Sequence, residues 1–120
     1  MIFSDDKPIY KQIYDYCCRH IGDGNWPTEE RIPSVKELSV DLQVNSRTVL
    51  KAYEELSLRD IIYQKRGLGF FVASDASEKI AQLRRDEFFS DTLPVFIDKI
   101  KALRLSADEI TSILNDALKN

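Results

Sequence analysis

Two apolar stripes of helical period, separated by a short polar break, constrain the fold more than any other feature of the sequence. They lie between Arg31 and Leu56, and the break reads QVNSRT. The stripes consist of Val35, Leu38 and Leu42 before the break and of Val49, Ala52, Tyr53 and Leu56 after it. This spacing predicts two helices that each bury one face and are joined by a turn of about four residues.

Candidate caps mark where each of these helices begins. Ser34 precedes the first stripe and Glu37 follows three residues later, which is the arrangement of a capping box. In the polar break, either Asn45 or Ser46 can cap the second helix. The break is therefore predicted to contain both the turn and the exposed first turn of the second helix.

The flanking segments predict another helix and a hairpin. The run PIYKQIYDYCCRHI has apolar residues at helical spacing, its Pro8 suits a first turn, and GDGNWP ends it. After the helix pair, IIYQKRGLGFFVAS predicts strands Ile61–Gln64 and Phe70–Ala73 around a glycine-containing loop, with Tyr63 and Phe70 paired across it. Together these elements predict a mainly α fold with a small β-hairpin, a winged helix-turn-helix.

The winged helix-turn-helix is predicted to occupy residues 1–75, followed by a short helical domain at residues 76–120. Pro94 is expected to kink or restart a helix, with Asp91 or Thr92 as its cap, and SADE is a second capping box that begins the last helix. Such a short segment holds too little for a core of its own, so its apolar faces must pack against the first domain or against another copy of the chain. These faces include Phe96, Ile100, Ile110, Ile113, Leu114 and Leu118.

Composition and motifs argue against several classes of protein. Hydrophobic residues make up 43% and charged residues 31% of the chain, which predicts a folded protein, and no apolar run approaches the roughly 18 residues of a membrane span. Cys17 and Cys18 are adjacent and the first residues do not form a secretory signal, so we expect packing thiols in a reduced, cytoplasmic protein. His20 has no nucleophile or metal-ligand cluster at a recognisable spacing, so neither an enzyme nor a metal or other cofactor is expected.

The net charge of −3 conceals a segregated distribution. The segment from Arg31 to Phe70 is net positive and the remainder is net negative. A local basic surface of this kind fits nucleic acid even in an acidic protein. The candidate DNA contacts are Asn45, Ser46, Arg47, Thr48 and Lys51 at the start of the second helix of the pair, Lys36 on the first, and Lys65, Arg66 and Gly67 in the hairpin loop.

The chemistry of these residues supports the assignment. Arg47 can bind guanine through two hydrogen bonds, and Asn45 can do the same for adenine or serve only as a cap. Lys51 lies one turn beyond Arg47 on the same helix face. Lys36 and the basic residues of the hairpin supply charge for phosphates, and Gly67 permits close approach to the DNA backbone.

In order and spacing, the fragments PIYKQI, RIPSVKEL, VNSRTVLKAYEEL and GLGFFV resemble the GntR family of bacterial transcription regulators over more than half of the chain. The short helical tail resembles the YtrA-type subfamily. The resemblance implies a homodimer paired through its tail helices that represses nearby genes, often those of membrane transporters. By position, it implies contacts from Ser46, Arg47 and Thr48 at the helix start and from Gly67 at the wing tip. Lys36 stands where the family usually has arginine, and Leu50 where many members have another basic residue.

The sequence thus predicts a homodimeric, sequence-specific DNA-binding regulator, most simply a repressor, whose operator has two-fold symmetry. Two alternatives stay open. One is a winged helix that uses its third helix or wing to hold a partner protein. The other is a regulator that senses a small-molecule effector at a site lined by Trp26, Phe88 and Phe89.

Overall fold

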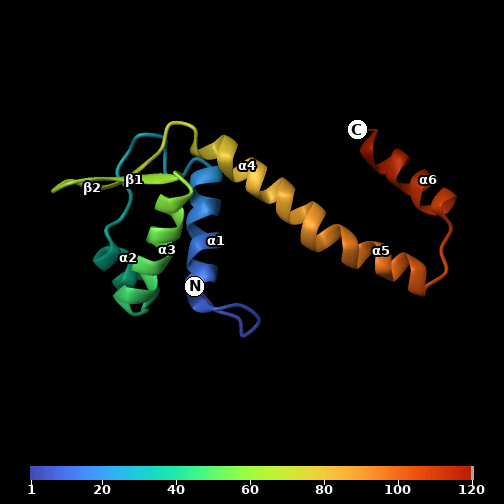
Figure 1. The fold of residues 1–120 in the computed structure, drawn as a ribbon, viewed down its shortest axis with the longest axis horizontal. Coiled ribbons are helices and arrows are strands. Elements are labelled where there is room, and N and C mark those ends of the chain that lie inside the picture. Colours follow the sequence, from blue (N-terminus) through green and yellow to red (C-terminus); the bar gives the residue numbers. More distant parts are fainter. Residues whose placement is uncertain (120) are drawn as a thin grey trace. The chain divides into compact units, whose positions relative to one another are not determined.

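The structure is a computed structural model that describes residues 1–119, and it divides into two units, Met1–Gln82 and Leu83–Asn120. The first unit contains helices α1 (Ile9–Gly22), α2 (Val35–Leu42) and α3 (Ser46–Leu58), strands β1 (Ile62–Lys65) and β2 (Gly69–Val72), and most of α4 (Ala76–Glu87) (Figure 1). The buried Ala76 and Ile80 of α4 lie in this unit. The unit therefore extends beyond residue 75, and the predicted domain boundary at that position stays a prediction.

The core of the first unit lies around α3, which sits between α2 and α1 and packs against both (Figure 1). The predicted stripe of α3 is confirmed, since all four of its residues are fully buried. On α2, Leu38 and Leu42 are buried as expected, whereas Val35 is half-buried. Cys17 and Cys18 lie in the core face of α1, which confirms that they are packing residues.

Local capping defines the helix-turn-helix. Ser34 accepts a hydrogen bond from the backbone N–H of Glu37 at 3.0 Å, and the Glu37 carboxylate accepts one from the backbone N–H of Ser34 at 3.1 Å, so the predicted capping box is confirmed. The α2 helix ends at Leu42, and its C-cap Gln43 has a φ of 55°, in the left-handed region. Of the two candidate caps for α3, Asn45 is the one the structure shows.

The two strands form an antiparallel hairpin whose register corrects one expectation. Tyr63 pairs with Phe71, not with Phe70, and their rings stack with centroids 5.8 Å apart. Phe70 lies opposite Gln64, and its ring meets that of Tyr53 at 5.1 Å in an edge-on contact. β1 begins and ends one residue later than predicted and β2 one residue earlier. Because successive side chains of a strand alternate between faces, Phe70 contacts Tyr53 of α3 while its neighbour Phe71 lies on the other face with Tyr63.

The chain before α2 runs alongside the hairpin and extends it. Ile32 donates a backbone hydrogen bond to the carbonyl of Phe70 at 2.9 Å, and Glu29 donates one to the carbonyl of Val72 at 2.7 Å. Arg31 forms an isolated antiparallel bridge with Phe71. These bonds occupy the open edge of β2 and connect the hairpin to the segment that leads into the helix-turn-helix.

The second unit contains the end of α4, a π-helical turn at Phe88–Thr92, α5 (Leu93–Ala102) and α6 (Ala107–Leu118). A separate helix, α5, does begin beside Pro94, which lies in its first turn, but the predicted cap is wrong: the Thr92 side chain makes no cap, and Leu93 donates its N–H to the carbonyl of Phe88 in the π-helical turn. Because proline lacks an N–H and its ring crowds the carbonyl four residues earlier, a widened π turn relieves the strain. The Ser106–Glu109 capping box is confirmed. No helix within residues 1–119 is long and apolar enough to cross a lipid bilayer.

Candidate nucleic-acid interface

The start of α3 is an exposed, electropositive helix end. The Asn45 side-chain oxygen accepts a hydrogen bond from the backbone N–H of Arg47 at 2.8 Å, and Asn45, Ser46 and Arg47 are all exposed. No acidic residue occupies the first turn of α3, whereas α2 has Glu37 there. The partial positive charge of the helix N-terminus is therefore uncompensated by a nearby carboxylate on α3, which favours the approach of an anion.

Arg47, Thr48 and Lys51 line one side of a surface cleft of about 390 Å³, and Ile9 and Tyr10 of α1 line the other. The Lys51 ammonium lies 3.9 Å from the centroid of the Tyr10 ring, which is a cation–π contact. Lys51 was predicted from the sequence as a site residue, whereas Ile9 and Tyr10 were not. They are separated from α3 by more than thirty residues, so no local pattern indicated that they would join it.

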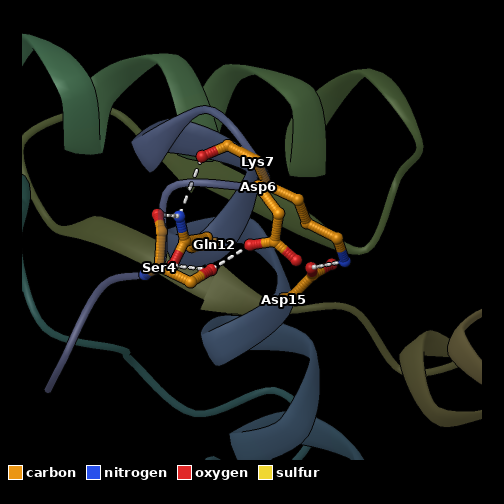
Figure 2. Close-up of polar contacts among 5 residues, drawn as sticks. All are labelled: Ser4, Asp6, Lys7, Gln12 and Asp15. Atoms are coloured by element: carbon orange, nitrogen blue, oxygen red, sulfur yellow. Dashed lines mark hydrogen bonds and ion pairs between the residues drawn. The ribbon is translucent and has the colours of Figure 1, made fainter.

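The segment before α1 is held in place by a buried glutamine, as Figure 2 shows. The Gln12 amide nitrogen donates to the carbonyls of Ser4 and Lys7 at 2.8 and 2.9 Å, and its oxygen accepts from the backbone N–H of Ser4 at 2.9 Å. Lys7 also forms an ion pair with Asp15 at 3.2 Å. These contacts fix the entry of the chain into α1 and thus the α1 wall of the cleft.

On α2, Lys36 is exposed in the first turn. Beside it, Arg31 forms an ion pair with Glu37 at 3.2 Å. The hydrogen bonds that Ser34 donates and the charge of Arg31 lower the pKa of Glu37, so this carboxylate is ionised at neutral pH. Glu37 therefore offsets part of the positive charge of Arg31, whereas within residues 1–119 no ion pair involves Lys36.

The basic residues of the wing lie at the tip of the hairpin, Lys65 at the end of β1 and Arg66 in the loop that follows. Lys65 and Arg66 are exposed, and the Lys65 ammonium lies 4.5 Å from the centroid of the Phe71 ring. Gly67 has a φ of +77° with open space where a Cβ would be, so its backbone is accessible. At Gly69 the φ of +113° favours glycine, and a Cβ there would lie 2.9 Å from Nε of the Arg31 side chain, which would have to move.

The structure places every predicted DNA-contact residue on the surface. Thr48 is half-buried and the others are exposed. Arg47, Thr48 and Lys51 share one cleft, Lys36 stands on the preceding helix, and the basic hairpin residues lie at the wing. The assignment of these residues to DNA stays a prediction, which the geometry permits.

Trp26, which the effector alternative places in a binding site, takes part in an aromatic cluster. Its ring stacks on that of His20 at 5.1 Å, and Tyr16 meets both rings edge-on. The Nδ2 of Asn25 lies 3.4 Å from Nδ1 of His20. Among residues 1–119, no three His, Cys, Asp or Glu side chains gather as a metal site would require.

The six predicted dimer residues lie in the second unit. Phe96, Ile113, Leu114 and Leu118 are exposed, with 65% of Ile113 and 79% of Leu118 accessible, and Ile100 and Ile110 are half-buried. Along α5 and α6 no described residue is buried. Such a concentration of exposed apolar side chains is unusual for the surface of a soluble monomer.

Comparison with known proteins gives a consistent match. The family described as "Bacterial regulatory proteins, gntR family" matches residues 9–72. The HTH-type transcriptional regulator YhcF of Bacillus subtilis is 30% identical, over 90% of this chain and 88% of its own. The HTH-type transcriptional repressor YtrA of the same organism is 33% identical, over 62% of this chain and 58% of its own.

Solved structures match either most of the chain or its first part. A transcriptional regulator of the GntR family from Bacteroides thetaiotaomicron superposes with a TM-score of 0.80 at 38% identity, over 93% of this chain and 97% of that one. The DNA-binding domain of AraR, solved in complex with the operator ORX1, has a TM-score of 0.57 at 27% identity, over 60% of this chain and 93% of that one. The similarity to the operator-bound protein covers only part of this chain, whereas the similarity to the Bacteroides regulator includes most of the tail.

Proposed function

We propose that this chain, which belongs to the gntR family of bacterial regulatory proteins, is a homodimeric repressor acting on a two-fold-symmetric operator. As a member of that family it is a DNA-binding transcriptional regulator and not an enzyme. The observation that carries this proposal is the start of α3. It is exposed, capped by Asn45, free of acidic residues in its first turn, and carries Arg47 and Lys51 on one face.

In the proposed complex, α3 is the recognition helix and its first turn enters the major groove. Arg47 reads guanine through its O6 and N7 atoms, since a guanidinium can donate two parallel hydrogen bonds to that edge. Ser46 and Thr48 contact the backbone or base edges beside it. Asn45 already uses its side-chain oxygen to cap α3, and an adenine contact from its amide is part of the proposal.

The remaining cations position the protein without reading sequence. Lys36 at the start of α2 binds phosphate on one side of the recognition helix, and Lys65 and Arg66 bind it from the wing. Gly67 allows the wing backbone to approach the sugar-phosphate chain, because no side chain stands between them. These contacts supply affinity that depends on salt concentration.

A second copy of the chain is proposed to cover the exposed apolar residues of α5 and α6. Dimerisation matters for affinity as well as symmetry, because one small module with few cations binds weakly. When one half-site is occupied, the linked second module meets the other half-site at a high effective concentration. Repression then follows from occupancy of a promoter in the cytoplasm, with genes of the transporter type near its own locus as the proposed targets.

A titration of the purified full chain tests this function. Fluorescence anisotropy would compare labelled promoter fragments from the chain's own locus with shuffled duplexes of equal length, at low and high salt. We expect one fragment to bind at least about 10³-fold more tightly than the shuffled duplexes. Affinity should fall steeply as salt rises. Equal binding of all duplexes would contradict the proposal and would favour the alternative of a protein-interaction module.

A further inference from the structure

Two elements that are far apart in the sequence meet at the DNA-facing end of α3. Lys51 of α3 places its ammonium 3.9 Å from the ring centroid of Tyr10, in the first turn of α1. At this distance the positive charge is attracted by the negative face of the aromatic ring. The contact therefore restrains a long, flexible side chain that would otherwise sample many rotamers.

The ammonium of Lys51 is held toward Tyr10 of α1 and not toward a carboxylate of α3. Lys51 has a potential carboxylate partner one turn further along α3 in Glu55, yet within residues 1–119 no ion pair involves Lys51. Its ammonium lies instead over Tyr10, in the cleft that Arg47 and Thr48 line. The ring thus holds the charge toward the start of α3 and leaves it without a carboxylate to neutralise it.

The ring is itself fixed in place. Tyr10 is half-buried, and α1 packs along α3. The chain entering α1 is held by the three hydrogen bonds of Gln12, drawn in Figure 2. These contacts support the Tyr10 ring, so the ring is in place to hold Lys51 without a ligand.

We propose that Tyr10 is a positioning residue for DNA binding, whose ring holds Lys51 where it binds a phosphate beside the recognition helix. This inference rests on the proposed function. A phosphate group is the chemical partner because an ammonium that forms no ion pair within residues 1–119, in a cleft beside the start of α3, attracts an anion. Pre-positioning lowers the conformational freedom that Lys51 loses on binding, and it does so for every duplex sequence.

Substitutions of Tyr10 distinguish the contribution of its aromatic ring to DNA binding from that of its hydroxyl. Tyr10→Phe keeps the aromatic face and should bind DNA like the wild type. Tyr10→Leu keeps apolar bulk without the aromatic face. It should lower the affinity for the promoter fragment and for shuffled duplexes alike, by about two- to fivefold, the range expected for an exposed cation–π contact. Anisotropy titrations of the full-length variants, with circular dichroism to verify that they are folded, measure both effects.

A double-mutant cycle tests whether Tyr10 acts through Lys51. In a Lys51→Ala background, Tyr10→Leu should have no further effect on affinity. In a Lys65→Ala background, the matched control, the two- to fivefold effect of Tyr10→Leu should persist in full. A loss caused by Tyr10→Leu in the Lys51→Ala background, or a Tyr10→Phe variant as weak as Tyr10→Leu, would overturn the inference.

Proton NMR chemical shifts report the contact between Lys51 and Tyr10 in the absence of DNA. The ε-methylene protons of Lys51 should be shifted upfield by the Tyr10 ring current in the wild type and in Tyr10→Phe, and should return to ordinary values in Tyr10→Leu. If they are unshifted in the wild type, the inference fails whatever the affinities. The proposed function fails separately, when the wild type itself shows no salt-dependent preference for any promoter fragment.

Discussion

The hydroxyl of Tyr53 donates a 2.7 Å hydrogen bond to the carbonyl oxygen of Pro33, so a buried side chain of α3 holds the residue that precedes the N-cap of α2. The Tyr53 ring also meets that of Phe70 in the hairpin. One side chain thus joins α3 to the segment before α2 and to the hairpin. Since Tyr53 is fully buried, this junction sets how the exposed start of α3 is presented.

Replacing Tyr53 by Phe should destabilise the protein with little change in packing. The substitution removes one hydrogen bond and leaves the Pro33 carbonyl without its donor. We expect the free energy of unfolding at neutral pH to fall by about 1 kcal/mol. Urea unfolding followed by circular dichroism measures it. An unchanged midpoint would show that the Tyr53–Pro33 bond does not contribute to stability.

The same pair predicts a pH dependence. Burial is the main cause that raises the pKa of Tyr53 far above its usual range, whereas in the unfolded chain the phenol ionises near pH 10. Below that pH both states keep the proton and the group causes no pH dependence. Above it the unfolded state holds fewer protons, so the free energy of unfolding falls by about 1.4 kcal/mol per pH unit for this group.

The Tyr53→Phe variant has no phenol at position 53, so its free energy of unfolding does not fall at alkaline pH for this reason. The stability advantage of the wild type over the variant should therefore shrink between about pH 9 and pH 11. Urea titrations of both proteins across this range test it, and the other tyrosines cancel because both proteins contain them. A constant difference across the range would contradict the assignment of a protonated, buried phenol.

Arg47→Ala tests base recognition. Loss of the guanidinium should cost about 1–3 kcal/mol at the specific operator and relax the base preference at one position of each half-site. Binding to shuffled duplexes should change much less. Arg59→Ala is the matched control, because Arg59 is an exposed arginine at the opposite end of α3 and should bind like the wild type.

Lys65→Ala tests phosphate binding by the wing. The affinity of this variant for all duplexes should fall by similar factors. The magnitude of the slope of log affinity against log salt should decrease by about 1. Anisotropy at four salt concentrations, on operator and shuffled duplexes, provides both quantities. If Lys65→Ala and Arg47→Ala behaved alike, the division between wing and recognition helix would be wrong.

Charged substitutions on α6 test the dimer. Ile113→Asp with Leu114→Asp should yield monomers in which the first unit keeps its circular dichroism and thermal transition, because carboxylates cannot be buried unpaired in an apolar interface. The control introduces two carboxylates nearby, at the exposed Ser112 and Asn115, and should stay dimeric. Light scattering after size exclusion gives the mass, and a persistent dimer in the first variant would place the interface elsewhere.

Features governed by local chemistry could be predicted from the sequence. Both capping boxes formed as expected because each depends on residues only three apart, Ser34 with Glu37 and Ser106 with Glu109. The buried stripe of α3 followed from its helical period. The tail could not be predicted as well, because Pro94 has more than one way to relieve its strain and the chain adopts a π turn.

Features that depend on distant segments were missed. Tyr63 pairs with Phe71 where Phe70 was expected, and the ring of Phe70 instead meets Tyr53 of α3, a contact between distant segments that the strand pattern alone does not contain. Tyr10 carries no local sign of its contact with Lys51. The candidate interface therefore had most of its charged residues predicted from the sequence, but not the aromatic side chain that supports one of them.

Methylation protection tests most directly whether the start of α3 enters the major groove. Dimethyl sulfate modifies guanine at N7, which faces the major groove, and adenine at N3, which faces the minor groove. With the operator saturated by wild-type protein, we predict protected guanine N7 positions in two symmetry-related half-sites, and loss of that protection with Arg47→Ala at equal occupancy. Guanines that stay fully reactive under the bound wild type, or protection that Arg47→Ala leaves unchanged, would contradict the account.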